Sequence, residues 1–130
     1  MSTHWKPEGY TTVSPYLVVR GAAREMDFLE QVFDAQRLRR YDLPDGSVMH
    51  AEVRIGDTVI MLGDAGGDWP PVPCHLHVYV EDVDAAYRRA LENGAEPVQE
   101  PVQKTPEDDR RGGVKSPAGN TWWIATQPSQ

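Results

Sequence analysis

Cysteine is almost absent from this chain of 130 residues, which contains only Cys74. A single cysteine excludes an intramolecular disulfide and a zinc site built from thiolates. Long apolar runs are also absent, because none approaches the roughly 18–20 residues that span a bilayer. The first residues are polar and lack the basic-then-apolar order of a signal peptide. We therefore expect a cytoplasmic protein with no membrane partner.

Positive charge is scarce as well. The chain has 13 Lys and Arg against 20 Asp and Glu, for a formal net charge of −7. Neutralising nucleic-acid phosphates needs clustered cations, and the short arginine runs here lie beside acids. We therefore expect no nucleic-acid partner. With 39% hydrophobic residues, the chain is apolar enough to fold, and its length suits a single domain over residues 1–130.

Two halves are separated by residues 65–73, where Gly and Pro are too dense to continue a helix or a strand. Apolar periodicity predicts a strand, a helix and three strands in each half. The predicted ranges are 13–19, 21–33, 37–41, 48–55 and 58–62, and then 74–80, 82–93, 96–102, 113–115 and 121–126, with residues 105–113 as a loop.

The second half repeats the first. Val80 follows Val19 by 61 positions, and Gly119 follows Gly56 by 63. A nearly constant offset with the same element order indicates an internal duplication. One strand–helix–strand–strand–strand unit covers only one face of its sheet, so the other face needs a partner.

Several short motifs follow one another in a fixed order. They are the runs at 15–19, 26–28, 44–46, 50–57, 76–84, 109–110 and 116–119, which read PYLVV, MDF, PDG, HAEVRIGD, LHVYVEDVD, DR and SPAG. In this order they resemble the vicinal oxygen chelate superfamily, and especially the small glyoxalase/bleomycin-resistance-like proteins of the PhnB type. The resemblance implies an α+β fold of two tandem βαβββ modules, over 13–64 and 74–126. The mixed sheets of such modules curl around a cavity, commonly in a homodimer.

The resemblance also places four metal ligands, usually His and Glu, on the first and last strands of both modules. In this sequence the four places fall at Ser14-Pro15, Ile60-Met61, His75 and Trp122-Trp123. Only His75 is a plausible ligand. We therefore predict no metal site and no cofactor, and the alternative is a divalent metal held by His75, His77 and His50.

Polar side chains that alternate along two strands are the candidate site residues. His75, His77 and Tyr79 share one strand face, as do His50, Glu52 and Arg54. We expect these faces to look into the cavity. One hypothesis makes His75 or His77 a catalytic acid or base that Glu52 orients. The other treats these side chains as hydrogen-bonded lining.

Aromatic side chains complete the predicted ligand site. Large flat rings around a concave site suit a planar ligand, and the candidates are Tyr16, Tyr79, Trp69 and Trp123. Arg110 at the rim is a candidate partner for an anionic group of the ligand. The sequence thus predicts a non-catalytic or metal-independent protein that binds an aromatic or amphipathic small molecule, with antibiotic sequestration as one use. The alternative is a metal- or His-dependent lyase, isomerase or dioxygenase of the same superfamily.

Overall fold

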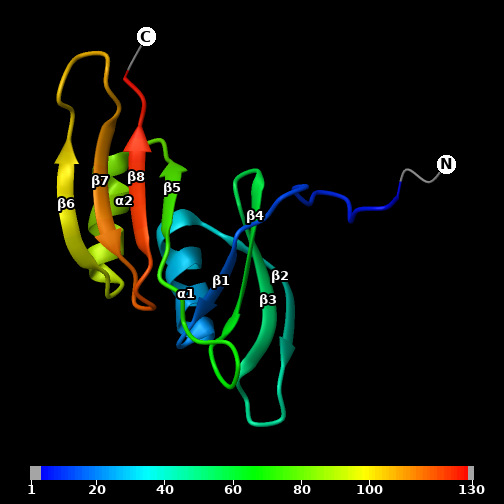
Figure 1. Cartoon of the computed structure of the whole chain (residues 1–130). Helices are drawn as coiled ribbons and strands as arrows, with labels where there is room; N and C mark the ends of the chain where they lie inside the picture. Colours follow the sequence, from blue (N-terminus) through cyan, green and yellow to red (C-terminus); the bar gives the residue numbers. More distant parts are fainter. Residues whose placement is uncertain (1–3, 129–130) are drawn as a thin grey trace.

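The computed structural model describes residues 4–128 and contains two sheets and two helices (Figure 1). The order of elements along the chain is strand, helix and three strands, repeated once. The elements are β1 (Tyr16–Val19), α1 (Ala22–Phe33), β2 (Gln36–Asp42), β3 (Val48–Ile55), β4 (Thr58–Asp64), β5 (His75–Tyr79), α2 (Val83–Glu92), β6 (Glu96–Val102), β7 (Arg110–Lys115) and β8 (Thr121–Thr126). We call the first five elements module 1 and the last five module 2.

Both modules have the same sheet topology. The strand orders are β1-β4-β3-β2 and β5-β8-β7-β6. The first strand of each module pairs in parallel with the last, and the other pairs are antiparallel. The predicted α+β fold of two βαβββ modules is therefore confirmed. Among the described residues, no helix is long and apolar enough to cross a membrane.

Local sequence explains where these elements begin and end. Asp82 caps α2 by accepting a hydrogen bond from the Ala85 N–H at 3.1 Å. Gly46 and Gly56 occupy the hairpin turns after β2 and β3 with φ values of 90° and 56°, a region that favours glycine. The predicted turn at residues 44–46 is therefore confirmed.

Two predicted strand starts are wrong. β1 begins at Tyr16 rather than at residue 13, and Val13 is exposed. β7 begins at Arg110 rather than at residue 113. Two adjacent glycines look like a loop in sequence, but Gly112 and Gly113 pair with β8 in a regular ladder. Pairing with β8, and not local β propensity, determines where β7 begins.

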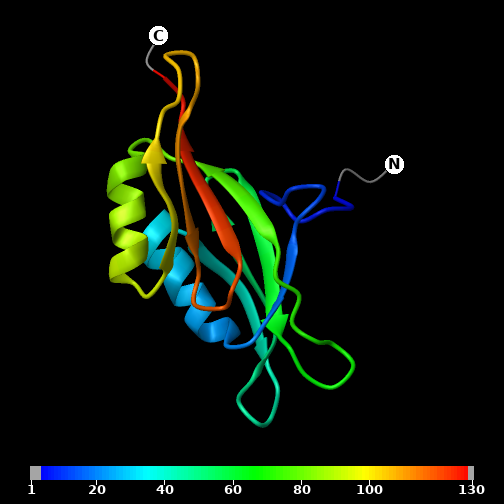
Figure 2. The same ribbon diagram turned by 60° about the vertical axis from the view of Figure 1, so that its left-hand side comes forward.

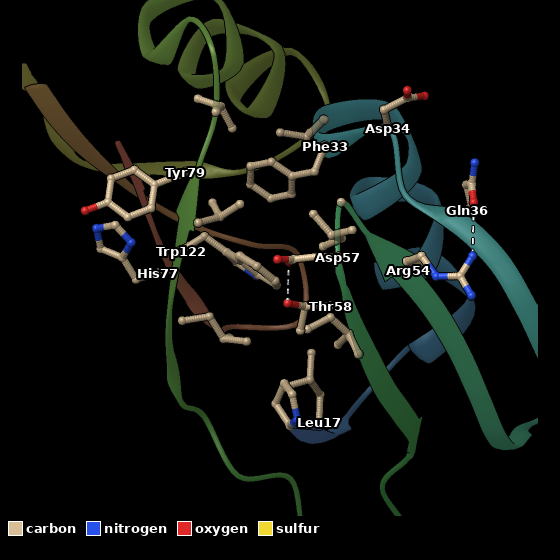
Figure 3. Close-up of a pocket in the computed structure, with 18 of the residues that line it drawn as sticks. Leu17, Phe33, Asp34, Gln36, Arg54, Asp57, Thr58, His77, Tyr79 and Trp122 are labelled. Carbon is tan, nitrogen blue, oxygen red and sulfur yellow. Dashed lines mark hydrogen bonds between the residues drawn. The ribbon is translucent and has the colours of Figure 1, made fainter. Parts of the chain in front are cut away.

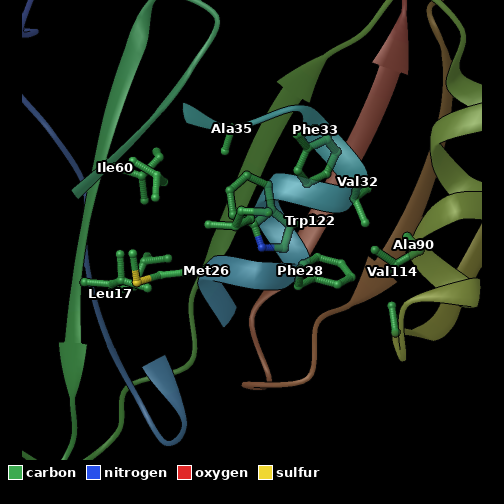
Figure 4. Close-up of a cluster of buried hydrophobic side chains, with 14 of the residues drawn as sticks. Leu17, Met26, Phe28, Val32, Phe33, Ala35, Ile60, Ala90, Val114 and Trp122 are labelled. Carbon is green, nitrogen blue, oxygen red and sulfur yellow. The ribbon is translucent and has the colours of Figure 1, made fainter. Parts of the chain in front are cut away.

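The core lies between the sheets and the helices, which both lie on one side of the sheets (Figure 2). Met26, Phe28 and Leu29 of α1 are fully buried. The rings of Phe33 and Trp122 lie 5.1 Å apart, so α1 also packs against module 2 (Figure 4). Burying such side chains is the main stabilising contribution to a domain of this size.

A buried carboxylate adds a polar link between the modules. Glu25 of α1 has no exposed surface and accepts hydrogen bonds from the Ser116 hydroxyl at 2.6 Å and the Ala118 N–H at 3.2 Å. Burial raises the pKa of Glu25, and these hydrogen bonds oppose the shift. The hydrogen bonds of Glu25 to Ser116 and Ala118 join α1 to the turn between β7 and β8.

Candidate functional site

Each sheet has a helix-covered face and an opposite face, which we call the open face. In module 1, Leu17 and Leu62 point toward α1, while their neighbours Tyr16 and Met61 occupy the open face. In module 2, Trp122 is buried on the helix side, and Trp123 lies on the open face. The alternation thus places most of the predicted site residues on the open faces.

The open face of module 1 carries a chain of hydrogen bonds around a buried carboxylate. Glu52 is 3% exposed, and His50 Nε2 donates to its Oε2 at 2.7 Å. The phenol of Tyr10 donates to the other carboxylate oxygen. Tyr16 Oη lies 3.1 Å from His50 Nδ1, and the guanidinium Nε of Arg39 lies 3.9 Å from Glu52 Oε1. Glu52 therefore has donors on both oxygens.

These contacts determine the charge state of the cluster. Burial alone would raise the pKa of Glu52, but the hydrogen bonds from Tyr10 and His50 outweigh it and hold that pKa below its usual range. Burial raises the pKa of Tyr16, and the nearby Glu52 charge raises it further. The cluster thus holds an ionised carboxylate and neutral phenols at neutral pH.

The open face of module 2 carries an aromatic platform instead, formed by Trp123 and His75. The planes of the two rings are nearly parallel, at 8°, with centroids 6.2 Å apart, and Trp123 Nε1 donates to His75 Nδ1 at 3.0 Å, so the rings lie edge to edge. The indole lies over Gly113, where an added Cβ would come within 2.6 Å of the ring. Only glycine at position 113 leaves room for this orientation of Trp123.

A second polar group borders the platform. Arg111 Nε donates to His77 Nε2 at 3.1 Å, and Arg111 Nη2 donates to Asp109 at 3.2 Å. The Tyr79 hydroxyl donates to the same Asp109 oxygen at 2.8 Å. Burial lowers the pKa of His77, and the Arg111 charge lowers it further. His77 is therefore a neutral acceptor at neutral pH.

A cleft of about 1250 Å³ lies between the modules and is bordered by β1 and β5. Figure 3 shows His77 and Tyr79 on one side of β5, and Phe33 and Trp122 on the other. The predicted site residues that line this cleft are Tyr16, Arg54, His75, His77 and Tyr79.

The other predicted residues lie elsewhere. His50, Glu52 and Trp123 occupy the open faces outside the cleft, and Trp69 is exposed in the segment between the modules. Arg110 forms a bidentate pair with Asp84 of α2, at 2.8 and 2.9 Å, and so points to the helix side. Adjacent strand residues alternate faces, which explains why Arg111 and not Arg110 reaches the open face.

The structure separates Glu52 from the histidines it was predicted to orient. Within residues 4–128, Glu52 bonds to His50 and Tyr10, and no hydrogen bond joins it to His75 or His77. The physical reason is that β3 and β5 belong to different sheets.

The side chains do not fit the metal that the resemblance implies. Strand register places Met61 beside Tyr16, and Trp123 beside His77, at matching points of the two sheets. Neither Met61 nor Trp123 is a carboxylate. In the part of the chain that the structure describes, no group of three or more His, Cys, Asp or Glu side chains is arranged to hold a metal ion.

Sequence reasoning missed five contributors to these clusters: Tyr10, Arg39, Asp109, Arg111 and Gly113. Tyr10 lies in a polar arm that carries no periodicity, and Asp109 and Gly113 lie in the segment predicted as a loop. The pairing of Gly113 with a tryptophan on the next strand is a pattern that could have identified the platform.

The fold and the open faces define a class of protein. A model of the Glyoxalase/Bleomycin resistance protein/Dioxygenase superfamily matches residues 10–124, so the chain belongs to this superfamily. Among its relatives is the uncharacterised protein Mb0911c of Mycobacterium bovis, which is 38% identical over 121 residues, covering 85% of this chain and 79% of Mb0911c.

Solved structures share the fold. TioX from Micromonospora sp. ML1 superposes with a TM-score of 0.74 at 24% identity, covering 90% of this chain and 98% of TioX. The fosfomycin resistance protein FosX of Listeria monocytogenes, solved with Mn(II) and a sulfate ion, has a TM-score of 0.70 at 13% identity over 90% of each chain. At these identities the likeness concerns the fold alone.

Proposed function

We propose that this protein binds a planar aromatic or amphipathic small molecule without a metal ion, in a cavity that a second copy of the chain completes. The observation that supports this most directly is the platform of Trp123 and His75 over Gly113. A flat indole held in place by a hydrogen bond offers a stacking surface whose orientation is set before the ligand arrives.

The state of the carboxylates supports metal independence. Glu52 and Asp109 lie on the open faces, and each already accepts hydrogen bonds from at least two donors. A hard divalent cation needs several free oxygen ligands. Binding one at either carboxylate would break these hydrogen bonds.

The edges of the sheets support the homodimer. β1 and β5 each end a sheet, and no other strand of residues 4–128 pairs with their outer edges. Tyr16 and Tyr79, on these edge strands, are 48% and 64% exposed. A second copy that pairs with these edges would cover backbone N–H and C=O groups that a lone chain leaves in water. We expect light scattering to give twice the chain mass of 14.6 kDa.

Sequestration of an antibiotic is one use of such a site. Fosfomycin resistance proteins are among the structures that share the fold. Sequestration needs tight binding and no turnover, which a rigid aromatic platform suits. A metal- or His-dependent reaction is the alternative, and the metal arm of the experiment below tests its metal-dependent form.

Calorimetry with N-phenyl-1-naphthylamine, a neutral aromatic probe, tests the proposal. We expect binding in EDTA, weakened by about tenfold or more in Trp123→Leu, as for an anchoring aromatic residue. The matched control is Trp69→Leu, because Trp69 is exposed at 71% outside the open faces. Binding that needs added Mn²⁺ or Zn²⁺, or equal loss in both variants, would contradict the proposal.

A further inference from the structure

The module 1 cluster contains an ordered chain of groups from the interior to the open face. Glu52 is buried, His50 is partly exposed, and Tyr16 is 48% exposed. The chain runs from the carboxylate through the imidazole to the hydroxyl, with contacts of 2.7 and 3.1 Å. A carboxylate, a base and a hydroxyl within hydrogen-bond reach form the general arrangement that activates a hydroxyl.

The hydrogen bonds have a defined direction. An ionised Glu52 can only accept, so His50 presents Nε2–H to it. In the imidazole tautomer that carries this N–H, the lone pair is on Nδ1, which faces the Tyr16 hydroxyl. The phenol therefore donates to an imidazole whose other nitrogen is held by a negative charge. If the phenolic proton moves to Nδ1, Glu52 stabilises the resulting imidazolium.

The surroundings hold this chain in place. The Tyr41 ring stacks on His50 with centroids 6.3 Å apart. A Cβ at Gly63 would lie 3.1 Å from the Tyr16 hydroxyl, so the glycine gives the phenol its room. The Tyr10 phenol engages the far oxygen of Glu52. These contacts hold the imidazole, the Tyr16 phenol and the Glu52 carboxylate in place one by one, as a positioned base requires.

We propose that Tyr16, His50 and Glu52 form a metal-free proton-transfer site, in which the Tyr16 hydroxyl touches the ligand and His50 and Glu52 are positioning residues. The substrate class is a carbonyl compound that can enolise. The enol O–H proton passes to Tyr16 Oη while the phenolic proton passes to His50 Nδ1. Returning one proton to the substrate carbon gives the ketone and restores the site. No oxidant, reductant or co-reactant is needed.

This site goes beyond ligand binding on module 2 and does not depend on it. The raised pKa of Tyr16 makes the neutral phenol its resting form. Removal of the phenolic proton at neutral pH therefore needs His50. This requirement gives a test of the site that uses no substrate.

The test is labelling by benzenesulfonyl fluoride, read by peptide mass spectrometry. The Tyr16 oxygen forms a bond to sulfur, fluoride leaves as the S–F bond breaks, and the phenolic proton passes to His50. At about pH 7 we expect Tyr16 to react at least about tenfold faster than Tyr41 or Tyr79, as general-base assistance predicts. Both comparison tyrosines are more exposed than Tyr16, at 51% and 64%.

Variants separate the chemistry from folding. In His50→Gln and Glu52→Gln we expect the advantage of Tyr16 to disappear at about pH 7, while all three tyrosines still react near pH 10, where free phenols ionise. Glu30→Gln is the matched control, because Glu30 pairs with Arg37 on the helix side. Equal rates for Tyr16 and Tyr41 in the wild type, or a Tyr16 advantage that persists in His50→Gln, would overturn the site.

The substrate class has its own test, the conversion of enol-phenylpyruvate to its keto form in EDTA. We expect wild-type protein to accelerate the conversion and Tyr16→Phe to lose the acceleration. Tyr87→Phe, which removes a phenol from α2, is the control. Selective labelling of Tyr16 without any acceleration would overturn the substrate class. Labelling without the aromatic probe keeps this result separate from the proposed binding function.

Discussion

The two modules share a backbone plan but place different chemistry on it. In module 1, Tyr16 of β1 pairs with Met61, which pairs with Glu52 of β3. In module 2, His77, Trp123 and Gly113 occupy the same three places. A buried carboxylate in one module thus corresponds to a glycine in the other.

The neighbouring position on the same face of the third strand, β3 in module 1 and β7 in module 2, also corresponds between the modules. Two residues before Glu52 stands His50, and two residues before Gly113 stands Arg111. Tyr16 lies 3.1 Å from His50, and His77 lies 3.1 Å from Arg111. Both modules therefore have a polar contact between the first and third strands, while the middle of the face holds the buried Glu52 carboxylate in one module and the Trp123 indole over Gly113 in the other.

The largest effect that would break this comparison is loss of the module 1 carboxylate. Glu52→Ala leaves Tyr10 and His50 without their acceptor, and we expect unfolding to become easier by about 2–3 kcal/mol, since buried donors would go unpaired. Urea denaturation measures this. Glu30→Ala is the control and should cost less than about 1 kcal/mol, as exposed ion pairs do. Equal costs would mean that the Glu52 cluster contributes nothing special.

Filling the space under the platform should have the next largest effect. In Gly113→Ala the new Cβ meets the Trp123 ring at 2.6 Å, so the indole must move. We expect a loss of about 1–2 kcal/mol, typical of overpacking, together with weaker binding of the aromatic probe. Gly66→Ala, whose Cβ meets nothing within 4 Å, is the control. Unchanged stability and binding in Gly113→Ala would show that Trp123 needs no such space.

The two modules should also respond to acid in different pH windows. His77 has a lowered pKa, so its contribution to stability is present above about pH 6.5 and is lost as the pH falls through its folded pKa. Glu52 also has a lowered pKa, so its contribution is lost only below about pH 4.5.

Urea midpoints across pH test these windows. His77→Asn should reduce the pH dependence of the urea midpoint in the upper window only, and Glu52→Gln should reduce it in the lower window only. The unfolded state binds more protons than the folded state in each window, so wild-type stability falls with falling pH in both. A single window affected by both substitutions would contradict the separate environments of the two modules.

The smallest effect should distinguish two adjacent arginines. Arg111→Gln removes a charge that lowers the His77 pKa, so we expect that pKa to rise. Arg110→Gln breaks the pair with Asp84 on the other face and should leave the His77 pKa in place. Histidine titration by NMR measures both. The same shift of the His77 pKa in both variants would contradict the placement of Arg110 and Arg111 on opposite faces of β7.

Periodicity and duplication were enough to predict the repeated order of strands and helices, because alternation and helical spacing are local properties of the sequence, whereas the fold of paired modules was implied by the resemblance. The helix over 21–33 and the strand over 121–126 agree with α1 and β8 to within one residue. The β7 start was not predictable from local sequence, because Gly112 and Gly113 join the sheet through β8.

The candidate site was predictable only in part. Parity placed His50 with Glu52 and His75 with His77, but it could not show which strands lie in the same sheet. The histidine that contacts Glu52 is therefore His50 of the same strand, and not His75 or His77 of β5. Tyr10 reaches Glu52 across 42 positions of sequence, a contact that no local pattern contains.

The central claim is that module 2 stacks a planar ligand on Trp123 without a metal. The most direct measurement is an NMR spectrum of the four tryptophan indole N–H groups as N-phenyl-1-naphthylamine is added in EDTA. The claim predicts that the Trp123 signal, whose N–H donates to His75, shifts most. No shift at Trp123, or a larger shift at Trp5 or Trp69, would contradict it.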